Sequence, residues 1–314
     1  MNKTKLVFLF VFSFGMTSLF AQTVTNYDSK TLARKTTLGQ LKMKESIAFT
    51  TKAIDKRNLM VTEMFYLHLN TLNFDAMSAL FSDEFKQHAA DVPDGFDGFQ
   101  DYVEAKDNGT AGKWNRYLDL SVVLTEKDHI ITLRKGNMND VVFDIMKFND
   151  MGQVAECWSF SQTIPDSAEN ARLMYDIGDE YLRPVKMKSE TVTANKAIVT
   201  EFIETAYKKG KRKKAAKKLM TENCIQHHPD ITDGLEAFGA SAKKLKYTMV
   251  NQMMFSQNDL VFVLSKASET VKKGETSQAF ALAQLFRVRK GKICEQWEVW
   301  MEVPENLAHT NGLF

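Results

Sequence analysis

Residues 85–99 read FKQHAADVPDGFDGF, and residues 224–238 read CIQHHPDITDGLEAF. Both stretches hold Gln-His, a later Asp, Asp-Gly and a closing Phe in the same order, with the second copy 139 positions after the first. A second block keeps this step, since Gly152, Glu156, Trp158 and Pro165 correspond to Gly291, Glu295, Trp297 and Pro304. Two motifs that repeat in order at one spacing, longer than any solenoid repeat, predict a tandem duplication in which each copy holds its own core.

The first 21 residues have the pattern of a signal peptide. Lys3 and Lys5 precede an apolar run, residues 6–20, and Ala21 is a small residue suited to cleavage. A membrane anchor is the alternative, but the run is short for a membrane span. We therefore expect a periplasmic or secreted product with no membrane partner after cleavage.

Charge and cysteine usage restrict the partners. Without Lys3 and Lys5, the 41 basic residues fall to 39 and equal the 39 acidic ones, so overall charge predicts no nucleic-acid partner. The basic run Lys208–Lys218 is most simply a solvated helix face, and an anionic partner is the alternative. No cysteine recurs between the copies, which favours free buried thiols over a shared disulfide framework. The cysteines are Cys157, Cys224 and Cys294.

The periodicity changes from helical to strand-like within each copy. We divide the chain into a signal peptide (1–21), an N-terminal arm (22–54), a first domain (55–165), a linker (166–194) and a second domain (195–314). In each domain three helices are expected, the second of copy one ending near Ser82, followed by an antiparallel sheet. This order predicts the α+β class: two tandem cone-shaped domains, each with three helices packed on a curved antiparallel sheet.

The motifs of copy two resemble those of the SnoaL-like polyketide cyclase family, which belongs to the nuclear transport factor 2-like (NTF2-like) superfold. The similarity lies in Gln226–Phe238, in the hairpin Phe286–Trp297 and in the tail Asn311–Phe314. It covers residues 195–314 well and residues 58–165 more loosely. The resemblance implies a cone of helices and bent sheet around a pocket, and an intramolecular aldol condensation that uses acid–base side chains without a metal or organic cofactor. The superfold also hosts isomerases, dehydratases and binding modules.

Both copies depart from the pattern of the family's last two strands, which read Asp-x-Phe-Arg and then Glu-His-Trp-Asp. Copy two has Gln284 and Gln296 where the family has the first aspartate and the histidine, but it keeps a carboxylate at Glu298. Copy one keeps Asp144 and has Ser159 in place of the last carboxylate. The two copies are therefore expected to differ in activity.

The candidate catalytic groups are a carboxylate and a histidine in each copy. We expect Glu298 and His227 to act in copy two, and Asp144 and His88 in copy one, because a carboxylate in an apolar pocket can serve as a base near neutral pH. The candidate ligand contacts are Gln87, Gln226, Gln284, Gln296, Trp158 and Trp297. In the alternative, the histidines anchor a loop and the tryptophans are core residues.

Strand alternation constrains but does not complete this site. Gln296 and Glu298 share one face of their strand, and Glu295 and Trp297 share the other, but the sequence leaves open which face lines a pocket. His227-His228 lacks a third ligand at a recognised spacing, so no metal is expected.

The predicted partner is a small apolar or carbonyl-containing ligand, with a non-catalytic carrier or assembly module as the alternative. The two linked copies are expected to form an intramolecular pseudo-dimer.

Overall fold

The computed structural model describes residues 52–109, 119–136, 139–166, 170, 174–177, 185–241, 247–269 and 278–314. The expected signal peptide and residues 22–51 of the expected arm lie outside this part of the chain. Among the described helices, none is long and apolar enough to span a bilayer.

Copy one is built from three helices and a five-stranded sheet. The helices are α3 (Ala53–Thr71), α4 (Phe74–Ser78) and α5 (Gly95–Gly109). The strands are β1 (Phe81–Gln87), β2 (Asp119–Glu126), β3 (His129–Lys135), β4 (Asp140–Phe148) and β5 (Val154–Thr163). They lie in the order β1-β5-β4-β3-β2, with β1 parallel to β5 and the other neighbours antiparallel.

Copy two repeats this arrangement in the same strand order, β6-β10-β9-β8-β7. Its helices are α6 (Ser189–Ile203), continued by the π-helix η2 (Glu204–Lys208), then α7 (Arg212–Leu219) and α8 (Leu235–Ala240). Its strands are β6 (Met220–Gln226), β7 (Tyr247–Gln257), β8 (Leu260–Glu269), β9 (Ala279–Arg289) and β10 (Lys292–Glu302). The predicted α+β class with a helix-covered sheet in each copy is confirmed.

One strand in each copy differs from the prediction. In copy one, a helix ending near Ser82 is expected before the Gln-His motif, but strand β1 begins at Phe81. The matching segment of copy two forms strand β6. These strands run parallel to the last strand of their copy, so neither sheet is wholly antiparallel. Phe81, Phe85 and Gln87 are buried while Asp83, Glu84 and Lys86 are not, and such a short, mixed pattern does not separate strand from helix.

The Asp-Gly of each motif forms the turn after this strand. Gly95 and Gly234 have φ angles of 76° and 103°, which side-chain-bearing residues rarely adopt. The preceding aspartates accept a hydrogen bond from the backbone N–H of the motif glutamine, over 2.8 Å from Gln87 and 2.9 Å from Gln226. The repeated Asp-Gly is therefore explained by backbone geometry.

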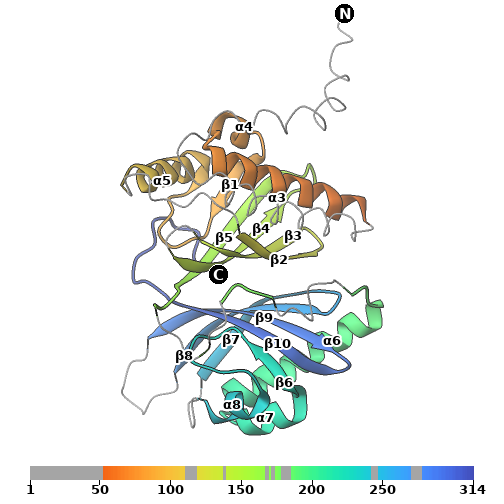
Figure 1. Cartoon of the computed structure of the whole chain (residues 1–314). Coiled ribbons are helices and arrows are strands. Elements are labelled where there is room, and N and C mark those ends of the chain that lie inside the picture. Colours follow the sequence, from red (N-terminus) through yellow and green to blue (C-terminus); the bar gives the residue numbers. More distant parts are fainter. Residues whose placement is uncertain are drawn as a thin grey trace, which may run out of the picture.

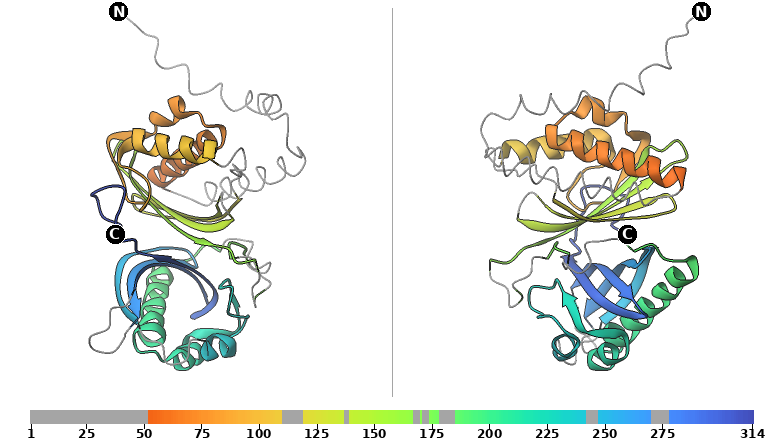
Figure 2. Two further views of the ribbon diagram at one scale, coloured as in Figure 1. Left: turned by 90° about the vertical axis from the view of Figure 1, so that its left-hand side faces the viewer. Right: turned by 45° about the vertical axis from the view of Figure 1, so that its right-hand side comes forward.

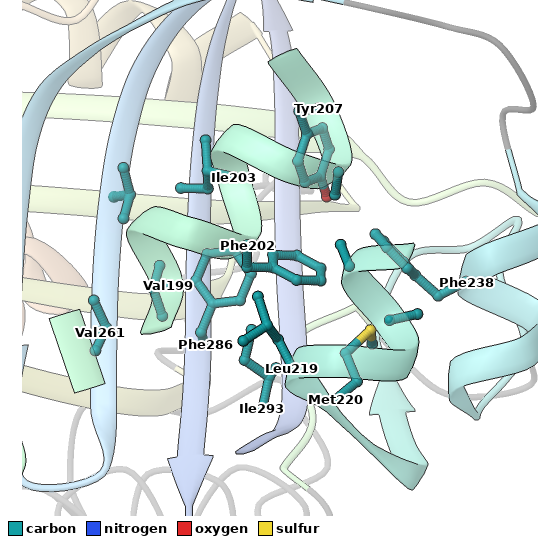
Figure 3. Close-up of a cluster of buried hydrophobic side chains, with 14 of the residues drawn as sticks. Val199, Phe202, Ile203, Tyr207, Leu219, Met220, Phe238, Val261, Phe286 and Ile293 are labelled. Carbon is teal, nitrogen blue, oxygen red and sulfur yellow. The ribbon is translucent and has the colours of Figure 1, made fainter. Parts of the chain in front are cut away.

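The molecule has four layers, with the helices outside and the two sheets facing each other at the centre (Figures 1 and 2). Each copy has a core between its helices and its sheet. In copy two, Phe202 and Tyr207 from the first helix meet Phe238 and the sheet residue Phe286 there (Figure 3). A third apolar cluster contains residues of both sheets, among them Phe143 and Phe262, whose ring centroids are 5.3 Å apart.

The segment that follows the sheet of each copy forms hydrogen bonds with the other copy. After copy one, the Asn170 side chain donates hydrogen bonds to the carbonyls of Gln226 and Ile231 in copy two. After copy two, the Asn311 side chain donates to the carbonyl of Gln87 (3.0 Å) and to Asp94 Oδ1 (2.7 Å) in copy one. We call these exchanged contacts the reciprocal clasp. Both asparagines bind the carbonyl of the motif glutamine of the opposite copy.

Candidate functional site

A buried polar cluster lies under the first helix of copy two. It consists of Glu298, Tyr207, Gln284, Gln296 and Trp300, and we call it the copy-two cluster. Glu298 Oε1 accepts hydrogen bonds from the Tyr207 hydroxyl, from the Gln296 amide and from Gln284 Nε2, the last over 3.1 Å. Glu298 Oε2 accepts from the Trp300 indole N–H over 3.1 Å, and Gln296 Nε2 also donates to the Tyr207 oxygen over 2.8 Å.

Two neighbouring strands and one irregular helix position these groups. Gln284 on β9 lies directly opposite Glu298 on β10, and Gln296 and Trp300 share the face of Glu298 because side chains alternate along a strand. Tyr207 comes from the π-helix that continues α6, an irregularity that is often found at functional sites. The rings of Phe202 and Phe238 lie beside Tyr207, with centroids 6.1 and 6.3 Å away, and Phe286 packs against Phe202 (Figure 3).

Burial changes the acidity of Glu298. Its side chain is 4% exposed, and in the described part of the chain no Lys, Arg or His forms an ion pair with it. Burial raises the pKa of this carboxyl from 4.5 to about 7, although the Trp300 hydrogen bond acts in the opposite direction. At neutral pH the group can therefore both accept and release a proton, as a general base requires.

The equivalent place in copy one holds a carboxylate with the opposite environment. Asp144 on β4 lies opposite Ser159 on β5, as Gln284 lies opposite Glu298. Asp144 Oδ2 accepts a hydrogen bond from Arg134 Nε over 2.6 Å and from the Tyr66 hydroxyl over 2.8 Å, and Oδ1 accepts from Ser159 over 2.7 Å. The ion pair between Arg134 and Asp144 is largely buried. Asp144 thus has a positively charged partner, whereas the hydrogen-bond donors around Glu298 are neutral.

The two motif histidines lie on the other face of their sheets. His227 Nε2 is 3.0 Å from Glu295 Oε1, and its ring stacks on Trp297 with centroids 4.7 Å apart. His88 Nε2 is 3.0 Å from Glu156 Oε2, and its ring stacks on Trp158 at 4.3 Å. Glu295 and Trp297 alternate with Gln296 and Glu298, so the structure does not bring either histidine to the carboxylate proposed for its copy.

The other four predicted ligand contacts do not belong to the copy-two cluster. Trp158 and Trp297 belong to the apolar cluster between the sheets. Gln87 Oε1 accepts from the backbone N–H groups of His88 and Ala89, and Gln226 Nε2 donates to Cys224 Sγ over 3.5 Å. Of the predicted set, Gln284, Gln296 and Glu298 lie together in the copy-two cluster, whereas each motif histidine lies with the tryptophan of its own copy.

Sequence reasoning did not identify Tyr207, Trp300 or Arg212. In the sequence, Tyr207 continues the helical apolar spacing of Val199, Phe202 and Ile203, where a tyrosine usually belongs to the core. Arg212 stood within the basic run, but its guanidinium lies 4.8 Å from the centroid of the Tyr207 ring and is 7% exposed. Its position at the start of the buried stripe of α7 was the available signal.

Thiol and metal chemistry were the remaining possibilities for a site. The three cysteines are free, with Cys224 and Cys294 buried and Cys157 half-buried. Within the ranges that the structure describes, no group of three or more His, Cys, Asp or Glu side chains is arranged to hold a metal ion.

No protein-family model matches this chain, and no curated protein matches it. Its structural neighbours include SnoaL-like polyketide cyclases and NTF2-like proteins. One is a SnoaL-like polyketide cyclase from Jannaschia sp. CCS1, 16% identical, which covers 37% of this chain and 91% of its own with a TM-score of 0.31. Another is an NTF2-like protein from Cytophaga hutchinsonii, 22% identical, with coverages of 34% and 88% and a TM-score of 0.28. A third, from Catenulispora acidiphila, has a ketosteroid isomerase-like fold and is in complex with trimethylamine; it is 18% identical, with coverages of 33% and 85% and a TM-score of 0.29. Each of these three matches covers about a third of this chain.

Proposed function

We propose that copy two is a cofactor-free acid–base site for a small, largely apolar ligand that contains a carbonyl group. The observation that carries this proposal is Glu298, a carboxyl with a pKa of about 7 that lies among neutral hydrogen-bond donors. The partly unsatisfied polar groups beside it support a ligand. Gln284 Oε1 and Gln296 Oε1 are buried and have no hydrogen-bond partner within the described part of the chain.

In this reaction Glu298 removes a proton from the carbon next to the ligand carbonyl. The electron pair of the broken C–H bond moves to the carbonyl oxygen and forms an enolate. A neutral donor, the Tyr207 hydroxyl or a glutamine amide, then donates a hydrogen bond to that oxygen. Return of the proton to another carbon gives an isomerase-type product, and attack of the enolate carbon on a second carbonyl of the same ligand gives an aldol product.

Copy one serves as the non-catalytic partner in this proposal. Asp144 forms an ion pair with Arg134 over 2.6 Å, so its carboxylate already has a charged partner that a substrate would have to displace. The difference between the copies follows from their last two strands, which have retained different carboxylates of the family pattern.

A non-catalytic ligand carrier is the second candidate, and one observation favours it. Glu298 already accepts hydrogen bonds from Tyr207, Gln284, Gln296 and Trp300. A substrate would have to displace some of these donors, whereas a purely structural cluster would keep them.

Turnover by a Glu298 variant distinguishes the two candidates. Mass spectrometry of molecules that co-purify with the protein identifies the ligand, and Glu298→Gln is then compared with Glu302→Gln, which alters an exposed glutamate of the same strand. Loss of a general base should lower kcat by about 100-fold or more while ligand binding is retained. Equal turnover in the two variants would remove Glu298 from the mechanism, and no turnover in the wild type would leave only the carrier function.

The protein is further proposed to be exported and to form an internal pseudo-dimer. The sequence of residues 1–21 supports export, and a mature N-terminus at or near Gln22 in peptide mapping is the expected result. The shared apolar cluster and the reciprocal clasp support the pseudo-dimer. Light scattering with small-angle X-ray scattering should give a compact particle of one chain; an elongated two-lobed particle or a stable two-chain mass would contradict this arrangement.

A further inference from the structure

The buried stripe of α7 contains a cation. The helix reads RKKAAKKL, and its buried positions are Arg212, Ala215, Ala216 and Leu219, at the three- and four-residue steps of one helix face. The lysines of this helix are exposed, so the basic run is a solvated face except at Arg212. A charged side chain thus occupies a position where the helix otherwise carries apolar residues.

The contacts of Arg212 leave its charge uncompensated. Its guanidinium lies 4.8 Å from the ring centroid of Tyr207 and 5.1 Å from that of Phe238, and Nη1 donates to Ser241 Oγ over 3.0 Å. Nε is buried without a hydrogen-bond partner, and no acidic side chain of the described residues forms an ion pair with it. The titratable groups that interact with it are Tyr247 and His228, and neither is an acid that is ionised at neutral pH.

A buried cation without a counter-charge is costly, and proteins usually pair such a group. Burial lowers the pKa of Arg212, but a guanidinium stays charged at neutral pH. Copy one shows the usual solution, since Arg134 is paired with Asp144. The position 139 residues before Arg212 is Asn73, an exposed residue whose side chain caps α4. The unpaired cation therefore belongs to copy two alone.

Arg212 is also next to the copy-two cluster. Its guanidinium packs on the ring of Tyr207, and the hydroxyl at the end of that ring donates to Glu298. The Tyr207 side chain therefore contacts both the guanidinium and Glu298, and it links the unpaired cation to the proposed base.

We propose that Arg212 binds a carboxylate of the ligand, so that copy two acts on an anionic oxo acid rather than on a neutral ketone. This inference rests on the proposed function, since it concerns the ligand on which Glu298 acts. A guanidinium with a free N–H and apolar walls suits one planar carboxylate, to which it donates charge-assisted hydrogen bonds. The ligand would supply the counter-charge that the described residues do not.

The experiment compares two probes of similar shape, benzoate and the neutral benzamide. Isothermal titration calorimetry with the full chain should show that benzoate binds more tightly. Arg212→Met should weaken benzoate binding by about tenfold or more and leave benzamide binding unchanged, because only the anion loses a charge-assisted bond. Lys213→Met is the matched control, since it removes one positive charge from an exposed position of the same helix and should change neither affinity.

A spectroscopic measurement on the wild type covers the case in which Arg212→Met does not fold. The arginine Nε–Hε resonance that disappears in Arg212→Lys should shift when benzoate is added and stay in place when benzamide is added. Equal affinities for the two probes, an unmoved resonance, or equal losses in Arg212→Met and Lys213→Met would each overturn the proposal.

The outcome separates this inference from the proposed function. Lost turnover in Glu298→Gln together with unchanged benzoate binding in Arg212→Met would reject only the anion site. Weakened benzoate binding in Arg212→Met together with full turnover in Glu298→Gln would reject only the acid–base role of Glu298.

Discussion

Two buried carboxylates of this chain, Glu298 and Asp144, lie at matching places under a helix tyrosine but in opposite electrostatic surroundings. Glu298 has only neutral donors, and burial raises its pKa to about 7. Asp144 is held by the guanidinium of Arg134. Removal of the charge should therefore have different consequences at the two residues.

The free energy of unfolding should depend on the protonation of Glu298. Its pKa is about 7 in the folded chain and 4.5 in the unfolded chain, so between these values the folded state binds more protons. The stabilisation is complete below pH 4.5 and is lost as pH rises to about 7, for a total of roughly 3 kcal/mol. Denaturant unfolding at pH 5 and pH 8 should show this loss in the wild type and a much smaller one in Glu298→Gln. The same loss in both proteins would assign the dependence to other groups.

Asp144→Asn should destabilise the protein by about 3 kcal/mol, because it leaves the Arg134 guanidinium buried without its counter-charge. Chemical denaturation measures this change. The double variant Arg134→Met with Asp144→Asn removes the uncompensated charge and should recover part of the loss. If the double variant is no more stable than Asp144→Asn, the ion pair is not the cause.

The elements of the fold differ in how far the sequence predicted them. The later strands of each sheet have long apolar or alternating patterns. The patterns in residues 141–148 and 280–288, for example, predict strands close to the observed β4 and β9. The first strand of each sheet is short and mixed, and β7, whose sequence is YTMVNQMMFSQ, has little apolar alternation. These strands form because neighbouring strands pair with them, which no local pattern reveals.

The candidate site was predictable in the same partial way. Alternation placed Gln296 and Glu298 on one face, but the choice of face depends on where the helices pack. The histidines were assigned to the site because of the family pattern, whereas their ring nitrogens bind Glu156 and Glu295 between the sheets. The role of Tyr207 follows only from the tertiary packing of its helix, whereas Arg212 has a sequence signal in its helical spacing to Ala215 and Leu219.

Replacement of the glycine in the first Asp-Gly turn should test whether backbone conformation alone explains the repeated motif. A Cβ built on Gly95 would meet no atom within 4 Å, so Gly95→Ala adds no clash. It should still cost about 1 kcal/mol, because φ is 76°. Gly95→Asn should cost less, since asparagine tolerates positive φ better. Denaturant midpoints measure both; equal costs would argue against a backbone origin.

At the scale of the whole molecule, the two copies are not independent units. The tail crosses to copy one, where the Ala308 N–H donates to the Ala90 carbonyl over 2.8 Å and His88 Nδ1 lies 2.9 Å from the Gly312 carbonyl oxygen. At the other edge, Lys196 of α6 pairs with Glu126 of β2 over 2.8 Å. Each copy therefore depends on the other for hydrogen bonds as well as for apolar contact.

Removal of residues 305–314 should loosen copy one, although it deletes nothing from that copy. The Gln-His loop would lose the hydrogen bonds of Asn311 to Gln87 and Asp94, and His88 would lose its contact with Gly312. Hydrogen-exchange mass spectrometry should show faster exchange at residues 87–95 in the truncated protein. A milder variant, Asn311→Ala, should produce the same change to a smaller extent; unchanged exchange in both would mean that the clasp contributes nothing.

The reciprocal clasp sets an order of events during protein synthesis. Copy one leaves the ribosome first, but the segment that completes its Gln-His loop is made only after the sheet of copy two. At ordinary rates of translation, the roughly 150 residues between Pro165 and Phe314 take on the order of ten seconds to make. Throughout that interval the sheet of copy one has no partner sheet, and its apolar face is open to other nascent chains. A duplication within one chain would therefore favour fast synthesis of the second copy. It would also favour a chaperone that covers the first copy until residues 305–314 can bind it.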